Sequence, residues 1–202
     1  MKAKQIPGVP IQKSGSFHDT ESEKHFENSS IASEKFDILK ERFFSINRWK
    51  SFTGAPLADF KLFNSNGNAI EQMPEIGNFI RIDIPGPGET ESRGYDWVEI
   101  VYISHQHTEQ SESYILTCRP SKIPGITTNP HIAHFYSNAA TSTFMIQKEG
   151  RKIKAGIYGR NEKPNLNARF IDKIRNILIA WGGMTGFSKI QWKSLTEGLL
   201  DF

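Results

Sequence analysis

The sequence predicts an α+β protein, in which helices pack on a curved antiparallel sheet or a partly closed barrel of about six to seven strands. Period-two runs of apolar and polar residues follow one another between residues 60 and 158, and short turns separate them. Strands joined by short turns favour antiparallel pairing. Helical three- and four-residue periods lie before and after that stretch, so no strand–helix–strand alternation indicates a parallel sheet.

Residues 1–30 are expected to form a flexible N-terminal arm, and residues 31–202 one α+β domain. Two prolines and two glycines interrupt the arm, and a polar run continues to Ser30. Such a segment buries too little apolar surface to offset the entropy lost on ordering it. A chain of 202 residues fits one domain with an appendage of this kind.

One helix is predicted directly after the arm. Ser33 is a reasonable N-cap, because its hydroxyl can accept from a free backbone N–H of the first turn. Phe36, Leu39 and Phe43 then recur at three- and four-residue steps and form an apolar face. The glycine and proline in residues 53–56 end the helix.

Six segments are predicted as strands from their alternation: residues 60–63, 80–84, 95–104, 113–119, 141–148 and 152–158. Asn66–Gly67 predicts a tight turn after the first strand. The Pro-Gly-Pro-Gly run at 85–88 ends the second, because proline cannot donate to a sheet ladder. Gly150 marks the turn of a hairpin formed by the last two.

Two helices are predicted at the C-terminal end of the chain. The first is capped by Asn167 and broken by the glycines of residues 182–186, and the second begins near Ser188 with the spacing of a capping box. Helices packed on a curved antiparallel sheet resemble the helix-grip lipid-binding domains in fold, which does not by itself establish a function.

The composition favours a cytoplasmic protein without membrane insertion. No apolar run reaches the roughly 18 residues that a membrane-spanning helix needs. The basic start is not followed by the apolar stretch of a signal peptide. Cys118 is the only cysteine, which rules out an internal disulfide and favours a reducing compartment. It lies in an alternating run, so we expect a buried core side chain rather than a nucleophile.

Charge is distributed unevenly along the chain. Acidic residues predominate between 71 and 112, and basic residues predominate between 148 and 193. Such a chain could bind a polyanion, pair its own two halves, or stack head-to-tail with a neighbour. No recognisable nucleic-acid module accompanies the basic stretch, which argues against a nucleic-acid partner.

The histidines are the candidate metal ligands. His105 and His107 are two positions apart and share one side of an extended segment, and His131 and His134 share one face of a helical turn. If the two pairs converged, they could hold a transition metal. Neither pair has the linear spacing of a zinc motif, so the sequence leads us to expect no cofactor.

Two further sites are weaker candidates. Arg160, Asn161 and Lys163 lie between a strand and a helix N-terminus, where an anion could bind; the alternative is a capped turn with an Arg–Glu pair. A ligand pocket between sheet and helices could be lined by four aromatic residues, which could equally be core: Trp97, Phe144, Phe170 and Trp181.

The sequence therefore favours a non-catalytic interaction or structural protein. It would dock to protein partners, or to further copies of itself, through the N-terminal arm and the polarised surface. The first alternative is a domain that binds a small apolar molecule in a pocket between sheet and helices. The second is a histidine-dependent metal hydrolase, for which no serine or carboxylate partner can be named.

Overall fold

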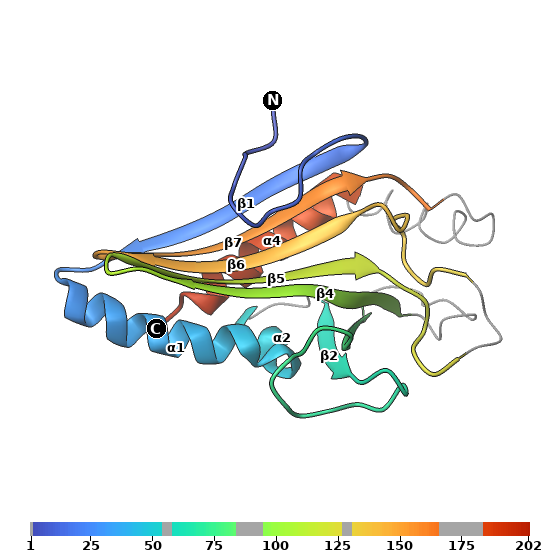
Figure 1. Cartoon of the computed structure of the whole chain (residues 1–202), viewed down its shortest axis with the longest axis horizontal. Coiled ribbons are helices and arrows are strands. Elements are labelled where there is room, and N and C mark those ends of the chain that lie inside the picture. Colours follow the sequence, from blue (N-terminus) through green and yellow to red (C-terminus); the bar gives the residue numbers. More distant parts are fainter. Residues whose placement is uncertain (1, 54–57, 84–94, 127–130, 166–183) are drawn as a thin grey trace.

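The fold is α+β, with a curved antiparallel sheet and helices packed on it (Figure 1). The computed structural model describes residues 2–53, 58–83, 95–126, 131–165 and 184–202. Seven strands form the sheet, in the order β1-β7-β6-β5-β4-β3-β2. Their bounds are β1 Ser16–His25, β2 Asp59–Phe63, β3 Phe79–Asp83, β4 Asp96–His107, β5 Ser111–Pro120, β6 Thr141–Glu149 and β7 Lys152–Glu162. The predicted fold class is confirmed.

The described helices are α1 (Ser29–Phe44), the 3-10 helix η1 (Ile46–Arg48), α2 (Trp49–Thr53) and α4 (Met184–Leu199). The apolar interior lies between these helices and the sheet. Trp49 lies within it, with ring centroids 5.3 Å from Phe60 and 4.9 Å from Phe144. Burying an aromatic side chain of this size contributes roughly 2–3 kcal/mol. Cys118 is also part of this interior, as predicted.

Strand β1 lies within residues 1–30, the segment predicted as an N-terminal arm. It pairs antiparallel with β7 along the edge of the sheet. The helix-facing side chains of β1 include polar ones: His18 stacks on Trp192 of α4, and Ser22 hydrogen-bonds to Thr196 of the same helix. The alternation that normally reveals a strand is therefore missing from the sequence. The flexibility of residues 1–30 as a separate unit remains a prediction.

Helix α1 begins four residues before the predicted N-cap. Asn28 caps it by accepting, through its side chain, a hydrogen bond of 2.9 Å from the Ile31 N–H. Ala32, Phe36 and Leu39 are buried along its inner face, as the three- and four-residue period predicts.

The Asn66–Gly67 turn is present, but it does not join β2 to its partner strand. Gly67 has a φ of +80°, a backbone conformation that glycine adopts without strain. The turn brings Ala69 beside Phe63, and the chain continues to residue 78 before β3 pairs with β2. We call residues 64–78 the β2–β3 connection. This connection forms one wall of the groove described below.

At the C-terminal end, α4 begins four residues before the predicted Ser188. The predicted helix at 167–181 lies outside the described residues. None of the described helices is both long enough and apolar enough to cross a membrane.

Candidate functional site

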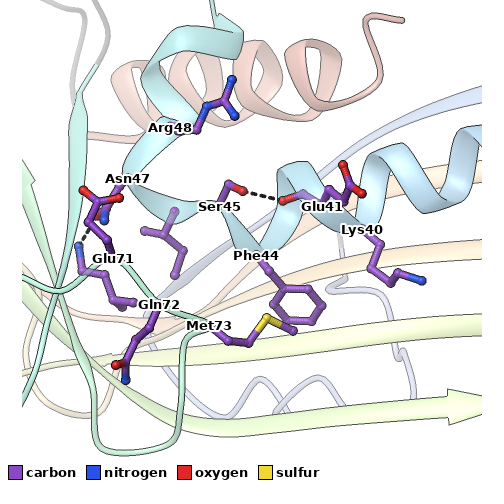
Figure 2. A pocket seen from close by; sticks show the side chains of 11 residues that line it. Lys40, Glu41, Phe44, Ser45, Asn47, Arg48, Glu71, Gln72 and Met73 are labelled. Atoms are coloured by element: carbon purple, nitrogen blue, oxygen red, sulfur yellow. Dashed lines mark hydrogen bonds between the residues drawn. The ribbon is translucent and has the colours of Figure 1, made fainter.

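A groove of about 520 Å³ opens between the end of α1, η1 and the β2–β3 connection (Figure 2). Three apolar side chains form part of its lining: Phe44, the buried Ile46 and the buried Leu62. Charged and amide side chains also line it: Lys40, Glu41, Asn47, Arg48, Glu71 and Gln72. Small-molecule sites typically measure roughly 300–1,000 Å³ and combine an apolar lining with a few polar groups. The groove has both properties.

The walls of the groove are tied together by Asn47. Its side-chain amide donates to the Ile70 carbonyl at 2.8 Å and accepts from the Leu62 N–H at 2.7 Å. At the end of α1, the Ser45 hydroxyl donates to the Glu41 carbonyl at 2.7 Å, so the chain turns sharply into η1. The two bonds of Asn47 connect η1 to β2 and to the β2–β3 connection, two elements that line the groove.

The β2–β3 connection also carries two exposed apolar side chains. Met73 is 59% exposed and lines the groove, whereas Ile76 is 61% exposed and is not among the lining residues. In Figure 2 the Met73 side chain lies beside the ring of Phe44. Methionine is flexible and polarisable, so it adapts to ligands of different shape.

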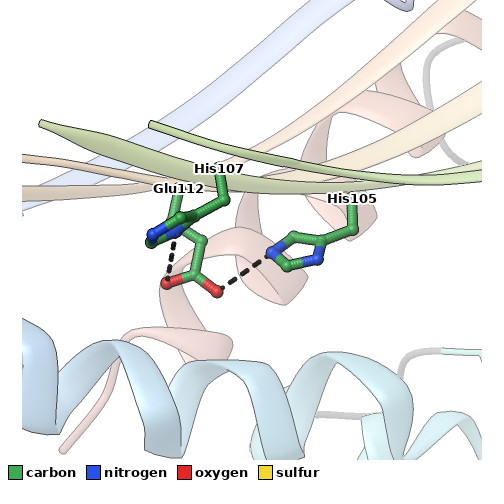
Figure 3. Close-up of side chains that lie close together, drawn as sticks. All are labelled: His105, His107 and Glu112. Carbon is green, nitrogen blue, oxygen red and sulfur yellow. Dashed lines mark hydrogen bonds and ion pairs between the residues drawn. The ribbon is translucent and has the colours of Figure 1, made fainter. Parts of the chain in front are cut away.

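A second cluster, His105, His107 and Glu112, lies at the end of the β4–β5 hairpin and faces α1 (Figure 3). His105 Nε2 is 3.2 Å from Glu112 Oε1, and His107 Nδ1 is 3.8 Å from Glu112 Oε2. The β4–β5 register places Glu112 directly opposite His107 and Tyr114 opposite His105. Glu112 was not predicted from the sequence, because its position depends on this register.

The other two candidate metal ligands do not join this cluster. Ala133, which lies between His131 and His134, accepts a hydrogen bond from the Trp97 N–H at the start of β4. Trp97 is eight residues before His105 on that strand. That separation is roughly 26 Å along a strand. His134 is buried, and its Nδ1 accepts from the Tyr136 N–H at 2.9 Å. Burial lowers the pKa of His134 to about 3. The structure therefore does not form the four-histidine site, and His131 lies at the far end with His134.

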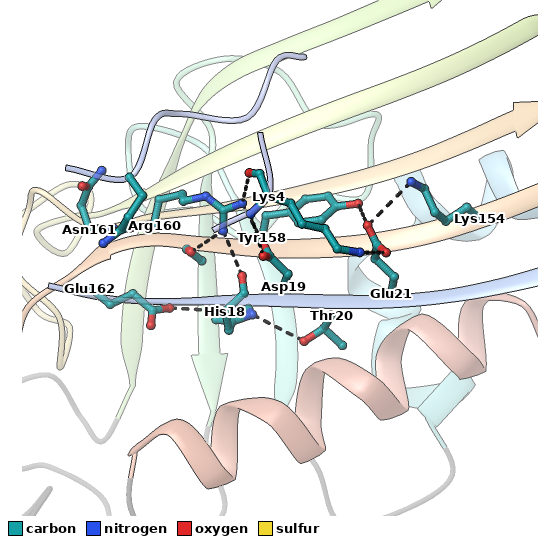
Figure 4. Close-up of polar contacts among 12 residues, drawn as sticks. Lys4, His18, Asp19, Thr20, Glu21, Lys154, Tyr158, Arg160, Asn161 and Glu162 are labelled. Carbon is teal, nitrogen blue, oxygen red and sulfur yellow. Dashed lines mark hydrogen bonds and ion pairs between the residues drawn. The ribbon is translucent and has the colours of Figure 1, made fainter. Parts of the chain in front are cut away.

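Two of the three predicted anion-binding residues, Arg160 and Asn161, instead hold the N-terminal segment, residues 2–15 (Figure 4). Arg160 is buried, forms an ion pair of 2.6 Å with Asp19, and donates to the Lys4 carbonyl at 2.9 Å. The Asn161 side-chain oxygen accepts from the N–H groups of residues 13 and 14, and its amide nitrogen donates to the Ile11 carbonyl at 3.2 Å. Lys163 follows β7, and its carbonyl accepts from residue 137. The donors of Arg160 and Asn161 are therefore already used within the chain.

A buried polar pair on the helix-facing side was not predicted from the sequence. His18 Nε2 lies 3.4 Å from Glu162 Oε1, and both side chains are almost fully buried. Gly159 makes room for the pair, since a Cβ there would lie 2.1 Å from Glu162 Oε1. Burial raises the pKa of Glu162 to about 7, although hydrogen bonds from Tyr136 and Ser16 partly offset this effect. His18 and Glu162 are 144 positions apart, so only the pairing of β1 with β7 brings them together.

The four residues of the predicted ligand pocket do not form one lining. Phe144 belongs to the apolar interior under the helices. Trp97 alternates with Val98 of that interior, so it lies on the opposite face of β4, where its ring packs 4.9 Å from Phe63. Phe170 and Trp181 lie outside the described residues.

Comparison with known proteins finds similar chains only among solved structures. No protein-family model matches, and no curated protein matches the sequence. The protein XoxI from Bacillus cereus is 14% identical over 93% of this chain and 97% of its own, with a TM-score of 0.40. Major latex-like protein 151 from Panax ginseng is 11% identical over 92% and 97%, with a TM-score of 0.36. Ara h 8.0201 is 10% identical over 93% and 100%, also with a TM-score of 0.36. At such values, the function has to be argued from the residues of this chain.

Proposed function

We propose that this protein is a non-catalytic binding protein that takes a small, partly apolar molecule into the groove between α1, η1 and the β2–β3 connection. The observation that supports this function is the groove itself, with a volume of about 520 Å³ and an apolar lining. An apolar body would contact Phe44, Ile46 and Met73. A polar group would meet the charged side chains around them.

The polar groups of the groove are arranged for contact rather than for catalysis. Lys40 donates to Asp37 at 2.8 Å, and this hydrogen bond raises the pKa of Lys40, so it stays a cation and cannot serve as a base. Ser45 donates its hydroxyl proton to a backbone carbonyl, which cannot activate it as a nucleophile. These two side chains can still hydrogen-bond or attract a ligand.

The test is titration with the fluorescent apolar anion 1-anilinonaphthalene-8-sulfonate, comparing the full chain with two variants. Met73→Asp places a charge in the groove and is expected to weaken binding roughly tenfold, or by about 1.4 kcal/mol. Ile76→Asp is the matched control, because Ile76 is equally exposed on the same connection but does not line the groove. Saturable binding that is lost only in Met73→Asp supports the proposal. No binding, or equal loss in both variants, contradicts it.

Docking of a protein partner is the second candidate function. It is favoured by an apolar cluster on the face of the sheet opposite the described helices, formed by Ile115, Met145 and Tyr158 and covered by Ile6 and Val9 of the N-terminal segment. An extended segment that lies on a sheet face can be exchanged for the same segment of a neighbour or for a partner peptide.

Removing residues 2–15 tests this second candidate. The shortened chain still contains β1 and is expected to expose the cluster, so size-exclusion chromatography with light scattering should show self-association that the full chain does not show. A synthetic peptide of residues 2–15 should bind the shortened chain and restore the monomer. A shortened chain that stays monomeric and does not bind the peptide would exclude docking at this face.

A further inference from the structure

We propose that His105, His107 and Glu112 form a binding site for one divalent transition-metal ion, with Zn²⁺ the best match, at the end of the β4–β5 hairpin. None of the three proposed ligands lines the groove, so the proposal does not rest on the groove's ligand. Three kinds of observation support it: the chemistry of the donors, their spacing, and the contacts that hold them in place (Figure 3).

The donor set is one that Zn²⁺ prefers. Two imidazole nitrogens and one carboxylate supply three ligands, and the fourth position of a tetrahedral ion can be filled by water. Imidazole suits zinc, copper and nickel, whereas calcium and magnesium prefer oxygen ligands alone. His105 and His107 are respectively 48% and 65% exposed, so an ion can reach them from solvent.

The spacing of the donors matches one bound ion. Two ligands bound about 2.1 Å from a tetrahedral zinc ion lie about 3.4 Å from each other. His105 Nε2 lies 3.2 Å from Glu112 Oε1, and His107 Nδ1 lies 3.8 Å from the other carboxylate oxygen, Oε2. One donor atom from each of the three residues lies within 4.8 Å of the other two. Small side-chain rotations therefore suffice to close the site around an ion.

Tyr114 holds two of the three ligands in place. Its ring stacks on the His105 imidazole at 4.2 Å with an interplanar angle of 2°, and its hydroxyl donates to Glu112 Oε1 at 2.9 Å. Phe44 of α1 packs edge-on against the same ring at 5.4 Å. Partners of this kind orient metal ligands, and their loss typically weakens metal affinity by about 10- to 100-fold.

Simple ion pairing does not account for the arrangement equally well. Exposed histidine–carboxylate pairs contribute little stability. Two imidazoles and a carboxylate that converge on one point are, by contrast, a donor set suited to a shared cation. Lys40 lies near Glu112 and Tyr114, and its positive charge repels a metal ion bound at the site, which lowers the metal affinity. We therefore expect affinity in the micromolar range rather than the tighter binding of a buried structural zinc site.

The experiment is isothermal titration of the full, tag-free chain with ZnCl₂ at about pH 7.5. We expect one ion per chain and a rise in melting temperature with added zinc. His107→Ala and Glu112→Gln should each weaken binding at least about tenfold, and Tyr114→Phe, which keeps the ring but removes the donor, should weaken it by about tenfold.

His25→Ala is the matched control. His25 is also exposed and lies 3.3 Å from a single carboxylate, that of Glu23, without a second histidine. The His25→Ala variant should bind zinc with the same affinity and stoichiometry as the unmodified chain. The proposal is overturned if the full chain binds no zinc, if His107→Ala and Glu112→Gln bind zinc as the unmodified chain does, or if His25→Ala alone removes binding.

Discussion

Burial changes the protonation chemistry of single residues in this protein. Glu162 is held away from water between β1, β7 and the residues before β6, and burial raises the pKa of its carboxyl to about 7. Desolvation disfavours the charged form, and the neighbouring Arg160 and hydrogen-bond donors recover only part of that loss. Near neutral pH this carboxyl therefore carries its proton for part of the time, unlike an ordinary glutamate.

Glu162→Gln is predicted to remove a pH dependence of stability. In the folded chain Glu162 has a pKa raised above that of the unfolded chain, so the folded state binds more protons between pH 4.5 and about 7. Stability is therefore lost as pH rises through this window, by up to about 3 kcal/mol. Glutamine keeps the shape but does not ionise, so the free energy of unfolding in urea, taken relative to that of the unmodified chain, should rise as pH rises from 4.5 to about 7. An unchanged pH dependence in the variant would refute this assignment.

At the scale of elements, α4 is held in place by close contacts at its C-terminal end. The Arg42 guanidinium of α1 donates to the carbonyls of Gly198, Leu199 and Asp201 at 3.1, 3.3 and 2.7 Å. A cation at this end satisfies free carbonyls and interacts favourably with the helix dipole. Gly198 also lets α4 approach α2, because a Cβ there would lie 2.1 Å from the Phe52 carbonyl oxygen.

Gly198→Ala is predicted to destabilise the protein. Alanine is the better helix former by about 1 kcal/mol, but the new methyl group would meet backbone atoms of α2 that cannot rotate away. The clash should dominate and lower the free energy of unfolding by about 1–3 kcal/mol, which chemical denaturation can measure. Glu197→Ala is the control on the same turn: its side chain is 60% exposed and forms an exposed ion pair with Lys193, so the variant should change stability by less than about 0.5 kcal/mol. A Gly198→Ala protein as stable as the unmodified chain would contradict the argument.

The strands that could be predicted from the sequence are those with apolar alternation. In β6, the buried Phe144 and Ile146 alternate with residues of the other face, and this pattern is independent of any other part of the chain. Strand β1 has no such pattern. Its outward residues are charged and depend on partners in β7: Asp19 pairs with Arg160, and Glu21 accepts from Tyr158. A strand stabilised by pairs across the sheet cannot be found from local periodicity.

The sites were harder to predict for the same reason. His105 and His107 lie on the same side of β4 because they are two residues apart in a strand. Glu112 lies beside them only because the β4–β5 register places it opposite His107. The groove depends on the turn after α1 and on the hydrogen bonds of Asn47, neither of which leaves an apolar period in the sequence. The same limit applies to the contacts between Arg160 and the N-terminal segment, which span 156 positions.

For the whole molecule, two buried groups affect stability in opposite directions as pH changes. Burial lowers the pKa of His134 from 6.5 to about 3, so below pH 6.5 the unfolded chain binds a proton that the folded chain does not. This loses stability as pH falls, by at most about 1.4 kcal/mol per pH unit. Glu162 loses stability as pH rises between 4.5 and about 7. The two slopes oppose each other between pH 4.5 and 6.5.

We therefore predict that their contributions nearly cancel between pH 4.5 and 6.5 and that single variants uncover them. His134→Asn keeps an acceptor for the Tyr136 N–H but does not ionise, so its stability should fall relative to that of the unmodified chain as pH rises through this window. Glu162→Gln should show the opposite slope, and the double variant should lose both. Urea unfolding at several pH values measures all four chains. If the two single variants change with pH in the same direction, at least one of the two buried groups does not ionise as its surroundings require.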